Sequence, residues 1–204
     1  MSDQTNPARP RSAEEDLALI RQMMAVGRRR AGVNGSHLVW WGVLLSTAFF
    51  LQYASVVNWI PEYGATIWIT MMVIGWAGSF YLGCKSDRSH LEHNPTFKAY
   101  GAAWLAVGIT MLVHMIASFA GNGTSPTGST MLAGGVIGSS FFVMSQVLRI
   151  RPMLYAAFGW WAIMAYAVYT PSFPKEILLI LSAASALLIM APGLYLSRLA
   201  TNGE

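Results

Sequence analysis

The chain has 204 residues, of which 54% are hydrophobic and only 11% are charged. This composition is too apolar for an ordinary soluble domain. Its 13 Lys and Arg against 9 Asp and Glu give a formal charge of +4, but in so apolar a chain the positions of the charges matter more than their sum, and they do not indicate nucleic acid binding. The single cysteine excludes an internal disulfide.

Residues 1–36 form a polar segment ahead of the first apolar run. In this segment Ser12 and Glu15 make a capping box, and the three arginines at 28–30 suit the C-terminal end of a helix. The apolar residues between them fall on one side of such a helix: Leu17, Ile20, Met23 and Met24. The pattern predicts an amphipathic cytoplasmic helix over about 13–30, which lies on anionic lipid, packs under the bundle or binds a protein partner.

Six apolar stretches follow, and each is long enough to cross a membrane. The apolar core of a bilayer is roughly 30 Å thick and needs about 20 apolar residues per helix, because lipid offers no partner to backbone N–H and C=O groups. The predicted fold is therefore all-α: a polytopic bundle over residues 37–198 with six transmembrane helices in three hairpins, and a tail at 199–204. The spans are expected at about 38–58, 64–84, 99–120, 130–149, 153–170 and 175–197. The first run is too long for a cleavable signal peptide.

The cations orient these spans. Six lie in the N-terminal segment, three between 85 and 98, two at 149–151 and one at Arg198, so only Lys175 falls on the other side. Lys and Arg are retained on the cytoplasmic face. The sequence therefore predicts a multi-pass protein with both termini in the cytoplasm.

The N-terminal quarter carries a resemblance. Leu17-x-x-Ile20-Arg21-x-Met23-Met24, followed by the arginine cluster, a glycine-bearing linker and a Trp-rich first span, resembles small six-helix bacterial inner-membrane proteins of unknown function. The resemblance implies a bacterial inner-membrane location. It brings no catalytic or binding residues to this chain.

The hairpins show weak internal similarity. A shift of 63 residues aligns Trp41 with Trp104, Gly75 with Gly138, and Arg88 with Arg151. Triplication of a two-helix unit explains this pattern. Interfacial tryptophans and cytoplasmic arginines, which any membrane hairpin has, explain it equally well.

Small residues recur at four-residue spacing in the second and fourth spans. The predicted packing residues are Gly75, Ser79, Gly83, Gly134 and Gly138. Such rows let helix backbones approach closely in lipid, where no hydrophobic force drives helices together. They predict packing inside the bundle, with a homo-oligomer as the other interpretation.

Ionisable groups are scarce in the spans, whose apolar centres hold no Asp, Glu, Lys or Arg. This disfavours coupled transport, which normally needs an intramembrane carboxylate. His114 is the one titratable group deep in a span, and Gln52 lies at about the same depth. The two are predicted to form a hydrogen-bonded polar pair. The alternative makes His114 a haem or copper ligand, although no cofactor is predicted.

The loop between the second and third spans offers Cys84, His90 and His93 as candidate zinc ligands. A solvated loop at the membrane surface is the simpler interpretation. The segment Gly135–Ser139 superficially resembles the nucleophile region of intramembrane serine proteases, but no histidine follows His114 to act as the base.

The sequence thus indicates a non-enzymatic scaffold, sensor or regulatory partner that contacts membrane lipid. The first alternative is a facilitator or carrier for a small neutral or lipophilic solute. The second alternative is a redox subunit that carries a cofactor on His114.

Overall fold

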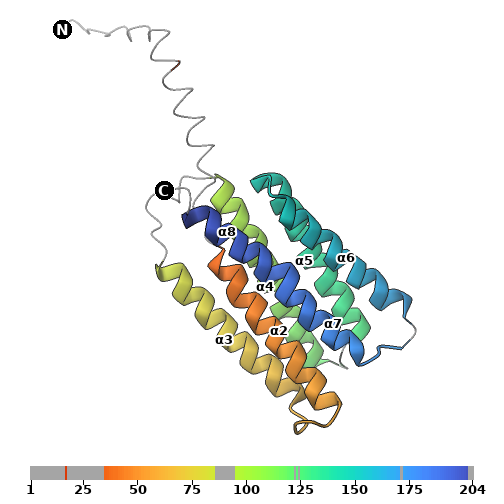
Figure 1. Cartoon of the computed structure of the whole chain (residues 1–204). Coiled ribbons are helices and arrows are strands. Elements are labelled where there is room, and N and C mark those ends of the chain that lie inside the picture. Colours follow the sequence, from red (N-terminus) through yellow and green to blue (C-terminus); the bar gives the residue numbers. More distant parts are fainter. Residues whose placement is uncertain are drawn as a thin grey trace, which may run out of the picture.

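The computed structural model describes residue 17 and residues 35–85, 95–121, 123, 125–170 and 172–201. These residues form helices and short connections, with no strand among them, and the helices run side by side in a bundle (Figure 1). In chain order the helices are α2 (Ser36–Val56), α3 (Gly64–Lys85), α4 (Pro95–Ala120), α5 (Pro126–Leu148), α6 (Arg151–Tyr169), α7 (Glu176–Ala184), η1 (Ser185–Met190) and α8 (Ala191–Thr201). The last three form one continuous helix.

Five helices are long and apolar enough to cross a membrane: α2, α3, α4, α5 and the continuous α7–η1–α8 helix. α6 has 19 residues but does not reach the same hydropathy, because it contains five tyrosines and tryptophans whose rings carry polar O–H and N–H groups. The all-helical fold and the membrane class agree with the sequence. That α6 also spans remains a prediction.

Two helices begin earlier than the sequence predicted. α4 starts at Pro95 rather than near residue 99, and α5 starts at Pro126 rather than near residue 130. Proline suits the first turn of a helix, where its missing N–H costs no hydrogen bond. At α5 the Ser125 side chain caps the helix by accepting a hydrogen bond from the Gly128 N–H at 3.0 Å.

The predicted N-terminal helix and the second cytoplasmic loop fall mostly outside the described residues. Of the segment 13–30, only Leu17 is described, and it is helical and exposed. His90 and His93 also lie outside the described residues.

The order of the helices across the bundle differs from the order that three independent hairpins would give. α3 packs on α2, α2 on the last helix, the last helix on α6, α6 on α5, and α5 on α4. The most extensive pairing joins α5 to α6, which belong to different predicted hairpins. The other consecutive helices are neighbours, but α3 and α4 do not pack closely on each other, and the most extensive contacts do not follow the hairpin units.

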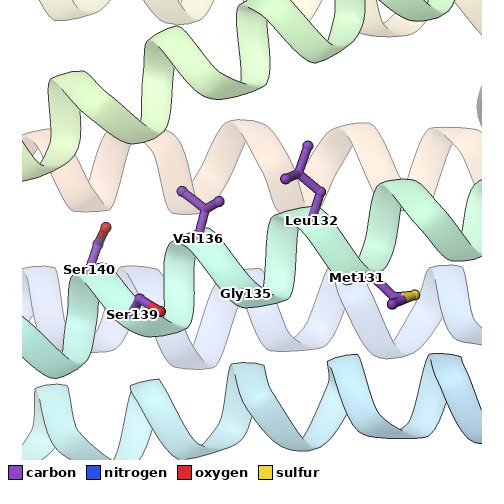
Figure 2. Close-up of a pocket in the computed structure, with 6 residues that line it drawn as sticks. All are labelled: Met131, Leu132, Gly135, Val136, Ser139 and Ser140. Carbon is purple, nitrogen blue, oxygen red and sulfur yellow. The ribbon is translucent and has the colours of Figure 1, made fainter.

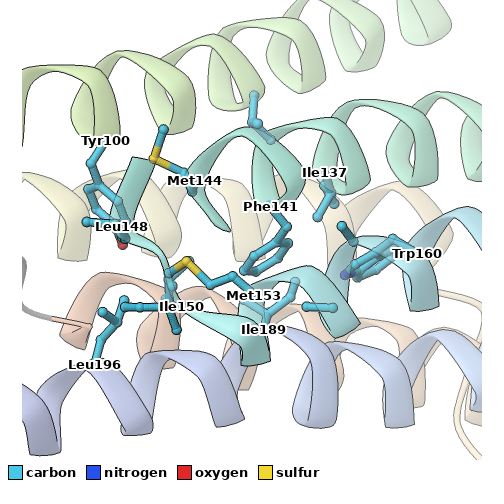
Figure 3. Close-up of a cluster of buried hydrophobic side chains, with 14 of the residues drawn as sticks. Tyr100, Ile137, Phe141, Met144, Leu148, Ile150, Met153, Trp160, Ile189 and Leu196 are labelled. Atoms are coloured by element: carbon cyan, nitrogen blue, oxygen red, sulfur yellow. The ribbon is translucent and has the colours of Figure 1, made fainter. Parts of the chain in front are cut away.

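The core lies around α5 and α6 (Figure 3). Phe141, Met153 and Trp160 are almost completely buried, and Trp104 of α4 packs edge-on against Phe141 at 4.9 Å between ring centroids. By contrast, only 11% of the apolar stretch of α3 and 6% of that of α4 is buried, against 44% of the last helix. α3 and α4 are therefore the peripheral helices, and their outer faces are left to the surroundings.

α2 and the last helix cross at backbone contact. A methyl group on Gly193 would lie 2.8 Å from Leu38 Cβ and 2.9 Å from the Gly35 carbonyl oxygen. One turn further into α2, a methyl group on Gly42 would lie 2.8 Å from the backbone nitrogen of Met190. Such a crossing needs residues without side chains, as in other close helix pairs in lipid.

The last helix contains a π-helical turn over Ser185–Met190, which the sequence analysis did not predict. Pro192 follows directly, and in a regular helix its ring would clash with the carbonyl of Leu188. The wider turn absorbs this conflict. Ser185 at the start of the turn is fully buried, and its hydroxyl donates to the Leu181 carbonyl at 2.8 Å.

Candidate functional site

Two tryptophans of α2 pack against the small residues of α3. A methyl group on Gly75 would lie 2.5 Å from the Trp41 ring. The Trp41 Nε1–H donates to Ser79 Oγ at 2.9 Å, and the Ser79 hydroxyl donates to the Gly75 carbonyl at 2.8 Å. The Trp40 Nε1–H also reaches the Gly75 carbonyl, at 3.3 Å. Gly75 thus leaves room for the indole rings of α2, and the Gly75 carbonyl and the Ser79 hydroxyl accept hydrogen bonds from them. Gly83 lies half-buried one turn further on.

In the same way, α6 packs against the small residues of α5. A methyl group on Gly138 would lie 2.6 Å from the Trp161 ring, and one on Gly134 would lie 3.0 Å from the Trp160 carbonyl oxygen. These glycines explain the tight pairing of α5 and α6. The two proposed repeat units differ in this contact. Gly75 packs against a tryptophan from its own hairpin, whereas Gly138 packs against one from the next hairpin.

His114 and Gln52 do not meet. The His114 Nε2 lies 3.0 Å from Ser129 Oγ of α5, within hydrogen-bonding distance. Gln52 belongs to α2, which packs on α3 and the last helix and not on α4. The polar pair expected from equal depth is therefore replaced by a histidine–serine pair between two consecutive helices. A haem or copper role for His114 would appear as a visible absorption band that His114→Ala removes.

Buried polar atoms without partners form a second feature of the interior. Among the described residues these are Gln52 Oε1, Trp76 Nε1, Tyr100 Oη, Trp104 Nε1 and Trp160 Nε1. Tyr100 and Trp104 lie one turn apart on α4, and Trp76 of α3 contacts Gly108 of α4. Most of these groups therefore lie on the three helices α2, α3 and α4. Of these residues only Gln52 was predicted from the sequence, although the Tyr100–Trp104 spacing also marks one helix face.

Replacing Gln52 with leucine is expected to raise the free energy of unfolding by about 1 kcal/mol, because it removes a buried acceptor that has no donor. The check is the unfolding midpoint of the purified protein in detergent, compared with the wild type. A loss of stability of similar size would show that Oε1 accepts a hydrogen bond in the native protein, which would contradict the prediction.

No metal centre is formed by the residues that the structure describes, which contain no group of three or more His, Cys, Asp or Glu. Cys84 lies exposed near the end of α3. Whether it joins His90 and His93 is outside the described residues.

An open groove of about 430 Å³ runs along α5. Its lining residues all come from α5: Met131, Leu132, Gly135, Val136, Ser139 and Ser140. Figure 2 shows Leu132, Val136 and Ser140 pointing toward α4, and Gly135 leaving the middle of the groove without a side chain. The groove therefore lies on the surface of α5 itself, where a methyl group on Gly135 would meet Met164 of α6.

The two ends of the bundle differ in charge. Lys98, Arg149, Arg151 and Arg198 are exposed at the end where α4 and α6 begin and where α5 and α8 finish; we call this the basic end. Glu62, Lys175 and Glu176 are exposed at the opposite end. Of these five described cations, all but Lys175 thus lie at one end of the helices, as the sequence predicted.

The described helices define the class of the molecule as a helical membrane protein. Comparisons with protein-family models, curated proteins and solved structures give no match to this chain. Its function therefore has to be inferred from its own residues.

Proposed function

We propose that this protein is a non-enzymatic scaffold or regulatory partner in the bacterial inner membrane, with six spans and with the basic end and both termini in the cytoplasm. The sixth span in this proposal is α6. The segment at 13–30 serves as the cytoplasmic contact for a protein partner. This assignment is supported by the charge difference between the two ends of the bundle.

One observation carries the scaffold assignment: only 11% of the residues in the apolar stretch of α3, and 6% of those in the apolar stretch of α4, are buried. Phe80 on α3 is 68% exposed and Val113 on α4 is 59% exposed. Large uncovered apolar faces mark surfaces that lipid or other helices cover. α4 packs on the buried centre through Trp104 and Phe141, and α3 packs on α2.

Deleting residues 1–30 is expected to abolish association with the partner while the bundle stays in the membrane with an unchanged unfolding midpoint. The measurement is chemical crosslinking in native membranes followed by purification of the tagged chain. Deleting only residues 1–11 is the matched control, because it leaves the predicted amphipathic helix intact. Unchanged crosslinking and phenotype after the longer deletion would contradict the proposal.

A facilitator for a small neutral solute is the second candidate, and the unpartnered polar atoms favour it. Gln52 Oε1, Trp76 Nε1 and Tyr100 Oη are costly to bury in a membrane interior, and a polar solute that passes between α2, α3 and α4 would satisfy them. The test is glycerol uptake into proteoliposomes. Uptake above protein-free vesicles that falls in Gln52→Leu would support this candidate, and uptake equal to protein-free vesicles would remove it.

A further inference from the structure

The outward face of α6 differs from the outward faces of α3 and α4. Exposed side chains follow it at alternating spacings of three and four residues: Tyr155, Phe158, Ala162, Ala165 and Tyr169. This is the spacing of a helix that packs along a second helix. The alanines in the middle would let two backbones approach closely, and the aromatic rings at both ends supply contact area. The outward faces of α3 and α4 instead carry side chains without polar atoms, such as valine, isoleucine and phenylalanine.

The tyrosines of this face do not suit a covering of lipid. Tyr155 and Tyr166 are both exposed, and they lie about 17 Å apart along the helix axis. The two membrane interfaces are separated by an apolar core of roughly 30 Å, and side chains in a helix lean toward its N-terminus, which directs Tyr166 back toward the middle of the membrane. At least one of the two hydroxyls therefore lies in the apolar core, where lipid chains offer no hydrogen-bond partner. On α3 the exposed Tyr63 and Tyr81 lie about 27 Å apart, so that both can reach an interface.

The inner contacts of α6 hold its outward face in place. Phe158 packs edge-on against Trp161 at 5.7 Å between ring centroids. Trp161 in turn fills the space left by Gly138 of α5, and Trp160 is only 1% exposed. Because α6 belongs to the most extensive helix pair of the bundle, its outward face is ready to bind without a change of fold.

The uncovered aromatic area is large enough for a specific interface. Four aromatic side chains of this face are 46% to 88% exposed: Tyr155, Phe158, Tyr166 and Tyr169. At about 200 Å² for each side chain, their uncovered parts amount to about 500 Å² per chain, so two copies would bury about 1,000 Å², which is the least that a specific interface needs. The same residues would meet across a two-fold axis, as in most homodimers.

We propose that a second copy of this chain covers the outward face of α6, in a parallel dimer whose two-fold axis runs along the membrane normal. The two α6 helices cross at Ala162 and Ala165, and the aromatic side chains pack at either end of the crossing. The pair is parallel because every copy inserts with the same orientation. This dimer goes beyond the scaffold assignment and rests on the proposed position of α6 in the membrane. It also accounts for the lower hydropathy of α6, since a helix covered by protein needs less apolar surface than one that faces lipid.

The test is oxidative crosslinking in native membranes of the full-length chain with Ala162→Cys in a Cys84→Ala background. Identical residues on the seam of a parallel pair approach closely enough to form a disulfide. A disulfide-linked dimer is expected for Ala162→Cys and for Ala165→Cys. Val113→Cys, at an exposed position on α4, is the matched control and should remain monomeric. Crosslinking at 162 and 165 no greater than at 113 would overturn the proposal.

The same thiol separates a failure of the dimer from a failure of the six-span arrangement. If α6 lies in the membrane, a membrane-impermeant maleimide does not label Ala162→Cys. A thiol that is neither labelled nor crosslinked overturns the dimer alone. A thiol that is labelled overturns the six-span arrangement and the dimer with it.

Ala162→Leu gives a second measurement that needs no cysteine. The larger side chain at the crossing should weaken dimerisation at least about tenfold, because it overpacks a close contact. The dimer fraction is measured by native mass spectrometry of the protein in detergent. Ala106→Leu, at an exposed position on α4, is the matched control and should keep the dimer fraction of the wild type. Equal dimer fractions in the two variants would contradict the proposal.

Discussion

Replacing Gly138 with leucine is expected to lower the free energy of unfolding by about 3 kcal/mol, the upper range for overpacking a close contact. The glycine seats the Trp161 ring, which a methyl group at this position would approach to 2.6 Å. A leucine there must push α6 away from α5 and open the most extensive helix pair of the bundle. The measurement is equilibrium unfolding of the purified protein in mixed micelles.

Gly135→Leu is the control for this prediction. It introduces the same side chain three residues earlier on the same helix, where a methyl group meets only Met164 Sδ, at an ordinary 3.6 Å. Its stability should stay within about 0.5 kcal/mol of the wild type. Equal destabilisation by both variants would mean that leucine perturbs α5 itself, and the seating of Trp161 would not be the cause.

Gly193→Ala is expected to lower the free energy of unfolding by about 2 kcal/mol, a large effect for one methyl group. The added carbon would lie 2.8 Å from Leu38 Cβ and from the Val39 nitrogen. Backbone atoms cannot rotate out of the way as a side chain can, so α2 and α8 must separate. Gly101→Ala adds the same methyl group to a helix where nothing lies within 4 Å, and it should be neutral or slightly stabilising.

If Gly193→Ala is as stable as Gly101→Ala, the backbone crossing of α2 and α8 is wrong. Thermal unfolding in detergent, followed by circular dichroism, distinguishes the two results. Gly35→Ala offers an independent check of the same crossing, because its methyl group would meet the Gly193 carbonyl.

Helix positions along the chain could largely be predicted from sequence, because the apolar lengths are imposed by the bilayer. The errors lie at the helix ends. Ser129 was expected in a loop, but Pro126 starts α5 early and brings Ser129 into its first turns. That shift supplies the partner of His114, which the sequence analysis had sought on another helix.

The lateral order of the helices could not be predicted in the same way. Equal depth suggested that Gln52 and His114 would meet, but depth says nothing about which helices are neighbours. That order depends on the sum of many weak contacts such as Trp161 on Gly138 and Gly35 on Gly193. The rows of small residues indicated where close packing occurs, but they did not identify the helix that fills each position.

The π-helical turn before Pro192 was also missed, although proline gives a recognisable signal for a local break. A proline alone does not specify whether a helix kinks, ends or widens. Here the helix widens and stays continuous, and it packs closely on α2 at Gly42 and Gly35.

The most direct test of the six-span arrangement uses Cys84, the single cysteine of the chain. It lies exposed near the end of α3, and α4, α5 and α6 separate it from the exposed Ser172. If all three helices cross the membrane, the two positions lie on opposite faces. If α6 does not cross, they lie on the same face.

The measurement is labelling of intact bacterial cells with a membrane-impermeant maleimide, comparing the wild type with Ser172→Cys in a Cys84→Ala background. We predict that Ser172→Cys is labelled in intact cells and that Cys84 is labelled only after the membrane is permeabilised. Labelling of both positions in intact cells, or of Cys84 alone, would contradict the six-span arrangement with a cytoplasmic basic end.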